Sequence, residues 1–370
     1  MQLTNNSSAS AENQPAPVPK GSPAARLTGV AAIVLVVAVA FLYLGGWFSP
    51  GALTPARFVD GFEQVQGIHS GFRRNHAKGV AVSGFFESNG QAVRLSKAVV
   101  FKPGRVPVIG RFSLGGGDPY VSDSPDATRG LGLLFRLDDG EEWRTAMINA
   151  PVFPFATPQA FYDRLIASQP DPKTGKPDPA EMAAFAAANP ETVRAVKIIG
   201  SHPPSSGFDN TAFYGLNAFW FTNAAGTSIH VRWSVVPVQP FAPANAAGSA
   251  AADKNYLFDA LVASIRQHPL QWHLIITIGQ PGDPTNDATL PWPDTREQVD
   301  VGTLTLDRVE SEETSIARDI NFDPLVLPSG IAPSHDPLLS ARSAVYSQSF
   351  TRRAGEKKEP SAITPSDVRK

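Results

Sequence analysis

The sequence predicts an α+β protein: an antiparallel β-barrel of about eight strands with inserted and flanking helices, preceded by one transmembrane helix. Three observations lead to this prediction. A 22-residue apolar run lies near the N-terminus, short alternating segments fall into two groups, and helical composition separates and follows those groups. Closing the sheet into a barrel removes the exposed edges that so many antiparallel strands would otherwise carry.

The composition excludes several classes of protein. The 370 residues contain no cysteine, which rules out disulfide frameworks, thiolate metal sites and a thiol nucleophile. Lysine and arginine total 32 against 34 aspartate and glutamate, a net charge of -2, and a nucleic-acid-binding surface would need a basic excess. Thirty-four prolines and 30 glycines indicate many turns and argue against a long helical bundle.

The first fifty residues are typical of a targeting segment. Residues 1–26 are polar and of low complexity, which predicts disorder, and residues 27–48 contain no charge. A helix of that length spans roughly 30 Å, the thickness of the hydrocarbon core of a bilayer. Lys20 and Arg26 precede it, so the rest of the chain is expected on the far side of a bacterial inner membrane, in the periplasm. A cleaved signal remains the alternative to this single-pass anchor.

The alternating segments predict strands and the segments between them predict helices. Period-two alternation is clearest from Ile229 to Val235, where Val231 and Trp233 share one face. The predicted strands are 80–88, 93–101, 107–114, 131–137 and 143–148 in the first group, and 217–223, 227–237, 272–280 and 299–309 in the second. The predicted helices lie within 50–75, 157–196 and 254–269.

Three separated segments carry motifs that go further than periodicity. In the first, Arg73 stands three residues before His76, and Ala77 and Gly79 follow. The second, residues 107–153, reads PVIGRFSL, then DATRGLGLLFRL, then NAPVF. The third, residues 322–353, reads FDPLVLPSGIAPSHD and continues into RSAVY and a later arginine.

In this order and at these separations, the three segments resemble those of the haem catalase superfamily. The resemblance covers roughly residues 60–353, so residues 50–353 are expected to form a haem-binding barrel of catalase type, and residues 354–370 a polar C-terminal tail that frays. It implies haem b as the cofactor, with its iron held by the phenolate oxygen of Tyr346.

The resemblance also implies a role for four arginines. Free tyrosine ionises near pH 10, and Arg342, four residues before Tyr346 on a helix, would favour the phenolate. Arg73, Arg111 and Arg353 would bind the two haem propionates, because a guanidinium fork matches a carboxylate.

On the opposite side of the haem, the resemblance implies three catalytic side chains. His76 would take a proton from the bound peroxide and return it to the departing oxygen. Asn149 would donate a hydrogen bond to the peroxide, and Ser113 would hold the other ring nitrogen of His76.

The chain departs from the longer catalases in ways that favour a peroxidase. It lacks most of the N-terminal arm and of the C-terminal helical region, and Asn75 replaces an apolar residue beside His76. It is therefore similar to the minimal catalase-related peroxidases. We expect reduction of hydrogen peroxide or organic hydroperoxides with an organic electron donor, and little dismutation, which needs a tight pocket. The alternatives are a haem carrier or sensor, and an isomerase of fatty-acid hydroperoxides.

The remaining patterns carry little signal. The other histidines show no metal-ligand spacing, and the acidic cluster Glu310, Glu312 and Glu313 is expected to face solvent. We expect a monomer or a small homo-oligomer that binds the membrane through residues 27–48.

Overall fold

The computed structural model describes residues 22–44, 52–244 and 254–369, which belong to two separate units divided along the sequence after Thr54. In the N-terminal unit, α1 (Pro23–Leu44) contains an 18-residue window from Arg26 to Tyr43 with a mean hydropathy of 2.2. By length and composition this helix could cross a membrane, as predicted for residues 27–48. Most of the predicted disordered segment, and the end of the predicted span from residue 45, lie outside the described residues.

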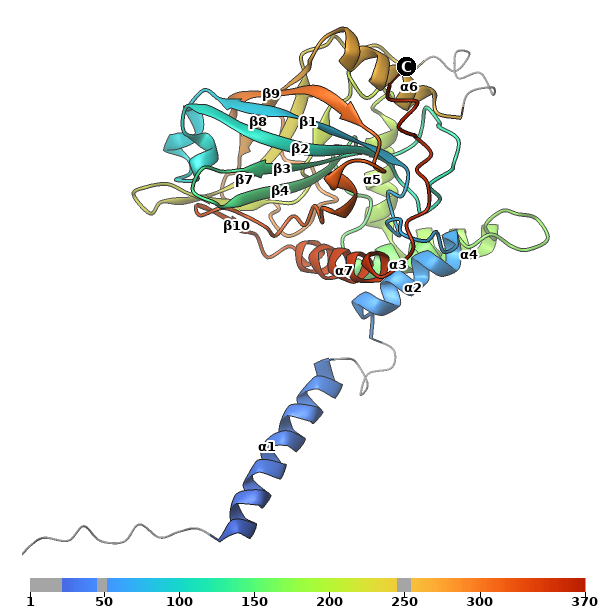
Figure 1. Ribbon diagram of the computed structural model, residues 1–370, viewed down its shortest axis with the longest axis vertical. Helices are drawn as coiled ribbons and strands as arrows, with labels where there is room; N and C mark the ends of the chain where they lie inside the picture. Colours follow the sequence, from blue (N-terminus) through green and yellow to red (C-terminus); the bar gives the residue numbers. More distant parts are fainter. Residues whose placement is uncertain (1–21, 45–51, 245–253, 370) are drawn as a thin grey trace, which may run out of the picture. The chain divides into compact units, whose positions relative to one another are not determined.

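The larger unit contains a closed antiparallel β-barrel of eight strands, which confirms the predicted fold class (Figure 1). The strands follow one another around the barrel in the order β7, β5, β4, β3, β2, β1, β9, β8, and β8 pairs with β7 to close it. They are β1 (Gly79–Ser88), β2 (Gly104–Leu114), β3 (Arg129–Arg136), β4 (Glu142–Ile148), β5 (Phe213–Tyr214), β7 (Ser228–Pro237), β8 (Leu270–Ile278) and β9 (Gln298–Glu310). Two further strands, β6 (Phe219–Thr222) and β10 (Ile331–Pro333), extend the sheet beside β7.

Alternation along the strands fills the barrel with apolar side chains. On β7, Val231, Trp233 and Val235 are at most 3% exposed, as their spacing predicts. Trp143 of β4 stacks on Phe135 of β3 with ring centroids 4.8 Å apart, and its other neighbour Trp233 lies edge-on at 5.2 Å. Close packing of such large rings gives the strands a rigid inner surface.

One of the strand predictions is wrong, and another strand lies outside the barrel ring. Residues 93–101 form two short 3₁₀ turns, η1 (Gln91–Arg94) and η2 (Val99–Phe101), with no strand between them. Val93 is 45% exposed, but Leu95, Ala98, Val100 and Phe101 join the barrel core, where Phe101 contacts the rings of Trp143 and Phe221. Residues 217–223 contain β6, which lies outside the barrel ring, and the ring uses the two-residue β5 in its place. Burial by tertiary contacts, without alternation, therefore explains the apolar content of 93–101.

The helices lie largely where the sequence places them. They are α2 (Pro55–Gln66), α3 (Pro158–Ala167), α4 (Pro179–Ala188), α5 (Pro190–Gly200), α6 (Tyr256–Gln267), α7 (Pro337–Ala354) and the 3₁₀ turn η3 (Ile316–Asp319). The helical composition of 179–199 is interrupted at Asn189, whose φ of −129° and ψ of 68° lie outside the helical region. Pro190 imposes this break because its ring disfavours helical geometry in the residue before it.

The C-terminal tail does not fray as predicted. Figure 1 shows it running from α7 along the barrel towards α6. Ile363 is fully buried, and its carbonyl accepts a hydrogen bond of 2.6 Å from Ser311 Oγ. Arg318 donates to the carbonyl of Glu359 at 2.7 Å, and Tyr120 donates to that of Pro360 at 2.8 Å. Hydrogen bonds from distant residues to its backbone hold this segment in place. The polar composition of the segment does not reveal these contacts.

A buried ion pair connects the start of β1 to the start of α6. The Lys78 ammonium donates to Asp123 Oδ1 at 2.6 Å and to the carbonyls of Val121 and Lys254 at 2.7 and 2.8 Å. The other carboxylate oxygen of Asp123 accepts from the Leu257 amide at 2.8 Å. The side chains of this pair are 1% and 0% exposed, so either charge left alone would be unsolvated.

We therefore expect Lys78→Ala to lower the free energy of unfolding by about 3–5 kcal/mol, because it leaves the Asp123 carboxylate buried without its cation. Urea unfolding followed by tryptophan fluorescence measures this loss. Lys102→Ala, at an exposed lysine, is the control and should change the free energy by less than about 0.5 kcal/mol. Equal effects of the two substitutions would contradict the assignment of the pair.

Candidate active site

A cavity lies on the outer face of β2 and β3, where α2, α7 and the segment before β1 border it. On β2, Phe112 points into the barrel core, so its neighbours Arg111 and Ser113 point to the opposite face and line the cavity. The cavity brings together seven of the eight site residues that the sequence predicts: Arg73, His76, Arg111, Ser113, Arg342, Tyr346 and Arg353.

His76 lies on the cavity wall in a left-handed backbone conformation, with φ of 57°. The Asn75 side chain supports this turn, since its Oδ1 accepts from the His76 amide at 3.0 Å and from the Gly116 amide at 2.8 Å. Asn75, the departure from the catalase pattern, thus stabilises the turn that presents the imidazole. Nδ1 of His76 lies 3.1 Å from Ser113 Oγ, which is the hydrogen bond expected from the sequence.

The surroundings of His76 keep its imidazole neutral. Burial, together with the positive charges of Arg111, Arg342 and Arg73, lowers the pKa of His76 to about 3. Such a ring can accept a proton at neutral pH, as a general base requires.

Tyr346 and Arg342 lie on α7, one helical turn apart, and both line the cavity. The guanidinium carbon of Arg342 is 5.8 Å from the centroid of the Tyr346 ring, and no hydrogen bond joins this guanidinium to the phenol oxygen. Arg342 donates instead to Asn217 Oδ1 at 2.7 Å and to the Ala146 carbonyl at 2.8 Å. The proximity expected from the i, i+4 spacing is present, but the direct bond is not.

The sequence analysis missed the residues that hold Arg342. Asn217 donates through Nδ2 to Asp336 at 2.8 Å, and Asp336 in turn caps the start of α7 by accepting from the Leu338 amide at 2.9 Å. This chain of bonds fixes α7 against β4, because Arg342 also reaches the Ala146 carbonyl. The sequence feature that could have identified Asn217 is its position as a polar residue at the edge of an apolar segment.

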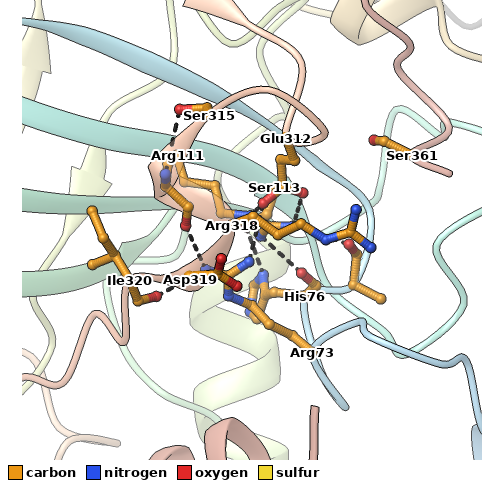
Figure 2. A network of polar contacts seen from close by, with 12 residues as sticks. Arg73, His76, Arg111, Ser113, Glu312, Ser315, Arg318, Asp319, Ile320 and Ser361 are labelled. Carbon is orange, nitrogen blue, oxygen red and sulfur yellow. Dashed lines mark hydrogen bonds and ion pairs between the residues drawn. The ribbon is translucent and has the colours of Figure 1, made fainter. Parts of the chain in front are cut away.

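Two of the three arginines predicted to bind propionates, Arg73 and Arg111, converge on the carboxylate of Glu312 (Figure 2). Glu312 accepts from Arg111 at 2.6 and 2.8 Å and from Arg73 at 3.1 Å, and its side chain is 2% exposed. The prediction that Glu312 faces solvent is therefore wrong, because its partner on β2 lies 201 residues away in the chain. These cations lower the pKa of Glu312 to about 2 against the opposing effect of burial.

Burial and mutual repulsion also act on the arginines. Burial, together with the charges of Arg111 and Arg353, lowers the pKa of Arg73 well below its usual value. Burial and the charge of Arg111 lower the pKa of Arg353 to about 10. The cluster therefore carries an excess of positive charge that an anionic ligand would compensate.

Asn149 is the predicted site residue that does not line the cavity. Its Oδ1 accepts from the Arg129 amide at 2.9 Å, and its own amide donates to the Arg129 carbonyl at 3.0 Å. Arg129 is fully buried and donates to Ser205 and Thr211, so Asn149 stands beside a firmly held strand end. Its proposed hydrogen bond to peroxide remains a prediction.

The residues present fit a haem group. Tyr346 would supply an oxygen ligand from one wall, and Arg73, Arg111 and Arg353 would supply cations for two propionates. Small residues keep the β3 wall flat: a Cβ at Gly130 would lie 2.9 Å from His76 Nδ1, and one at Gly132 would lie 2.8 Å from the Phe322 ring. The two glycines thus leave room for the side chains of His76 and Phe322, which also line the cavity, against β3.

Comparisons with known proteins agree with this site. The family model described as Catalase matches residues 58–363. A catalase-related peroxidase of Synechococcus elongatus is 38% identical over 328 residues, covering 89% of this chain and 96% of the relative. Another, of Mycolicibacterium paratuberculosis, is 32% identical over 307 residues, covering 82% of this chain and 96% of the relative.

Solved catalases share the fold. A fungal catalase superposes with a TM-score of 0.70 at 21% identity, over 78% of this chain and 60% of the catalase. A bacterial catalase gives a TM-score of 0.69 at 23% identity and covers 58% of that structure. The chain thus spans about three fifths of the length of these solved catalases.

The chain belongs to the catalase family and shares its fold, and this membership implies that it binds haem. It is an oxidoreductase of the peroxidase type, and the relatives that match it along almost their whole length are the short catalase-related peroxidases.

Two lowered pKa values predict how the haem-free protein responds to acid. His76 changes from 6.5 unfolded to about 3 folded, and Glu312 from 4.5 to about 2, so the unfolded chain binds protons more readily at both. Their contribution to stability is complete above pH 6.5 and 4.5, respectively, and is lost as the pH falls towards the folded values.

We expect His76→Gln to flatten the fall in unfolding free energy between pH 6.5 and pH 3. Urea unfolding at a series of pH values measures that slope. His268→Gln, at an exposed histidine, is the matched control and should leave the slope unchanged. A slope that His76→Gln does not alter would show that the imidazole stays exposed to solvent protons in the folded state.

Proposed function

We propose that this protein is a haem-dependent peroxidase that reduces hydrogen peroxide or organic hydroperoxides at haem b, with Tyr346 as the tyrosinate ligand and little catalase dismutation. The observation that carries this proposal is the shared cavity, which has the His76–Ser113 pair on one wall and Tyr346 on another. The similarity to catalase-related peroxidases over almost the whole chain supports it.

The chain's own residues move one proton in the proposed reaction. A neutral His76 accepts the proton of the bound peroxide through Nε2, while Ser113 holds Nδ1 and fixes the ring. The same imidazole then returns the proton to the departing oxygen, which leaves as water or an alcohol. When bound, haem supplies the iron at which the oxygen–oxygen bond is cleaved.

The cavity lining supports organic hydroperoxides as substrates. Phe58 and Phe62 of α2 and Phe153 and Phe161 near α3 line it, and these rings offer an apolar surface to an alkyl group. An organic electron donor, in place of a second peroxide, would complete the cycle, and the similarity to catalase-related peroxidases supports this.

The proposed location is the bacterial inner membrane, crossed once by α1, with the barrel unit in the periplasm. The length and composition of α1 support a membrane span and are equally compatible with a signal segment near the N-terminus. We propose a monomer or a small homo-oligomer.

His76→Ala should retain haem and lose peroxide turnover by roughly 10²–10⁴-fold, the usual contribution of a general acid–base group. Stopped-flow spectra with an organic hydroperoxide and then a phenolic donor measure each half of the cycle in the full-length protein. Full activity of this variant would contradict the assigned role.

Wild-type protein that binds haem without responding to peroxide would favour a haem carrier or sensor. Rearrangement of a fatty-acid hydroperoxide without donor consumption would favour the isomerase.

Tyr346→Phe removes the phenol oxygen and keeps the ring that packs beneath Arg342. We expect loss of the tyrosinate-type ferric absorption spectrum and weaker haem retention on a desalting column, because the iron loses its protein ligand. Tyr214→Phe is the control at another partly buried tyrosine, and it should leave the spectrum unchanged. An unchanged spectrum in Tyr346→Phe would assign the ligand to a different residue.

A further inference from the structure

Glu312 lies within the arginine cluster (Figure 2). The proposed catalytic scheme assigns it no role. Glu312 follows β9, and its carboxylate accepts from Arg111 Nε at 2.6 Å, from Arg111 Nη2 at 2.8 Å and from Arg73 Nη1 at 3.1 Å. The positive charges of Arg318 and Arg353 also act on it. Two arginines thus bond one buried carboxylate, and the charges of two more act on it.

The charges around this site do not balance within the protein. Arg73, Arg111, Arg318 and Arg353 carry four positive charges, and all but Arg73 are fewer than a tenth exposed. Glu312 contributes one buried negative charge; the other nearby carboxylate, Asp319, is 53% exposed and lies 4.0 Å from Arg353. Burying like charges without counter-ions costs several kcal/mol per ion, so Glu312 carries much of the compensation in the haem-free chain.

Backbone carbonyl groups hold Arg73 and Arg111 independently of Glu312. Arg111 donates to the carbonyls of His76 and Ala77 at 2.8 and 2.9 Å. Arg73 donates to the carbonyls of Ala317 and Ile320, both at 3.0 Å. Because these bonds fix both guanidinium groups, the distinct contribution of Glu312 is its charge.

The same arginines retain capacity for an external anion. Arg73, Arg111 and Arg353 all line the cavity. Within the described part of the chain, Nε of Arg73 and Nε and Nη2 of Arg353 have no protein acceptor, so a carboxylate entering the cavity would find donors beside those that Glu312 uses.

We propose that Glu312 is an internal counter-ion that takes the place of a haem propionate in the haem-free chain, so that the arginine-lined pocket folds before the cofactor binds. This inference rests on the proposed function only in taking haem as the anionic ligand. It gives a chain that folds before haem arrives a physical route to its cofactor. A chain that crosses the membrane unfolded must fold first and acquire haem afterwards, and a preformed cluster reduces the cost of binding.

The test is Glu312→Gln in the full-length protein in detergent, since glutamine keeps the shape and an acceptor oxygen but removes the charge. Urea unfolding midpoints are measured without ligand, with haem and with haem dimethyl ester, which lacks the propionate charges. Glu310→Gln, two residues away and exposed, is the matched control. We expect Glu312→Gln to lower the haem-free midpoint clearly and haem to restore most of the loss.

The increase in midpoint on adding haem should therefore be larger in Glu312→Gln than in wild type, whereas the dimethyl ester should restore little. An equal loss with and without haem would make Glu312 an ordinary structural ion-pair partner and overturn the inference. A midpoint like that of Glu310→Gln in every condition would overturn it as well.

Two further measurements keep the result decisive. If haem-free Glu312→Gln does not fold, its soluble yield in haem-supplemented and haem-depleted cultures is compared with that of Glu312→Asp, which keeps the charge. The proposal is supported if haem supplementation raises the soluble yield of Glu312→Gln. It is contradicted if supplementation raises the yield of neither variant. If wild type takes up no haem, the proposed function and the propionate analogy both fail. The haem-free comparison then still decides whether Glu312 stabilises the arginines.

Discussion

Strand β2 faces the barrel core on one side and the active site on the other, and this division determines where the functional residues lie. Phe112 packs into the core, while its neighbours Arg111 and Ser113 line the cavity. A slip of one residue in the pairing of β2 would exchange these faces. Closure of the barrel prevents that slip, because β2 is paired continuously with β1 and with β3. The core packing is thus the reason that the His76–Ser113 pair forms.

The active site combines a neutral base with a cluster of cations, and both depend on burial. Removal of water makes protonation of His76 unfavourable, and the arginines around it add to that effect. The same burial makes the arginines costly, and the carboxylate of Glu312 offsets part of the cost. A chain that retained the arginines without Glu312 would depend more strongly on its ligand for stability.

The remaining wall of the site depends on contacts that join distant parts of the chain. Helix α7 carries Tyr346, and the bonds from Arg342 to Asn217 and to the Ala146 carbonyl attach that helix to the barrel. The C-terminal segment continues from α7 along the barrel, and Arg318 and Ser311 bond its backbone. The tail therefore helps to hold the region next to the arginine cluster, although its composition resembles that of a disordered terminus.

The sequence by itself determined the barrel class, the alternation of β7, the placing of Arg342 and Tyr346 one turn apart, and the motifs that led to seven residues of one cavity. These features depend on local periodicity and on short motifs, which a linear sequence displays directly. Only the tertiary structure decided that Glu312 is buried against Arg111, that residues 93–101 turn inward, that the tail packs, and that Asn149 lies away from the cavity wall. Each of these depends on a partner or a packing surface far away in the chain, and the charge or apolarity of a residue does not specify which distant group it will meet.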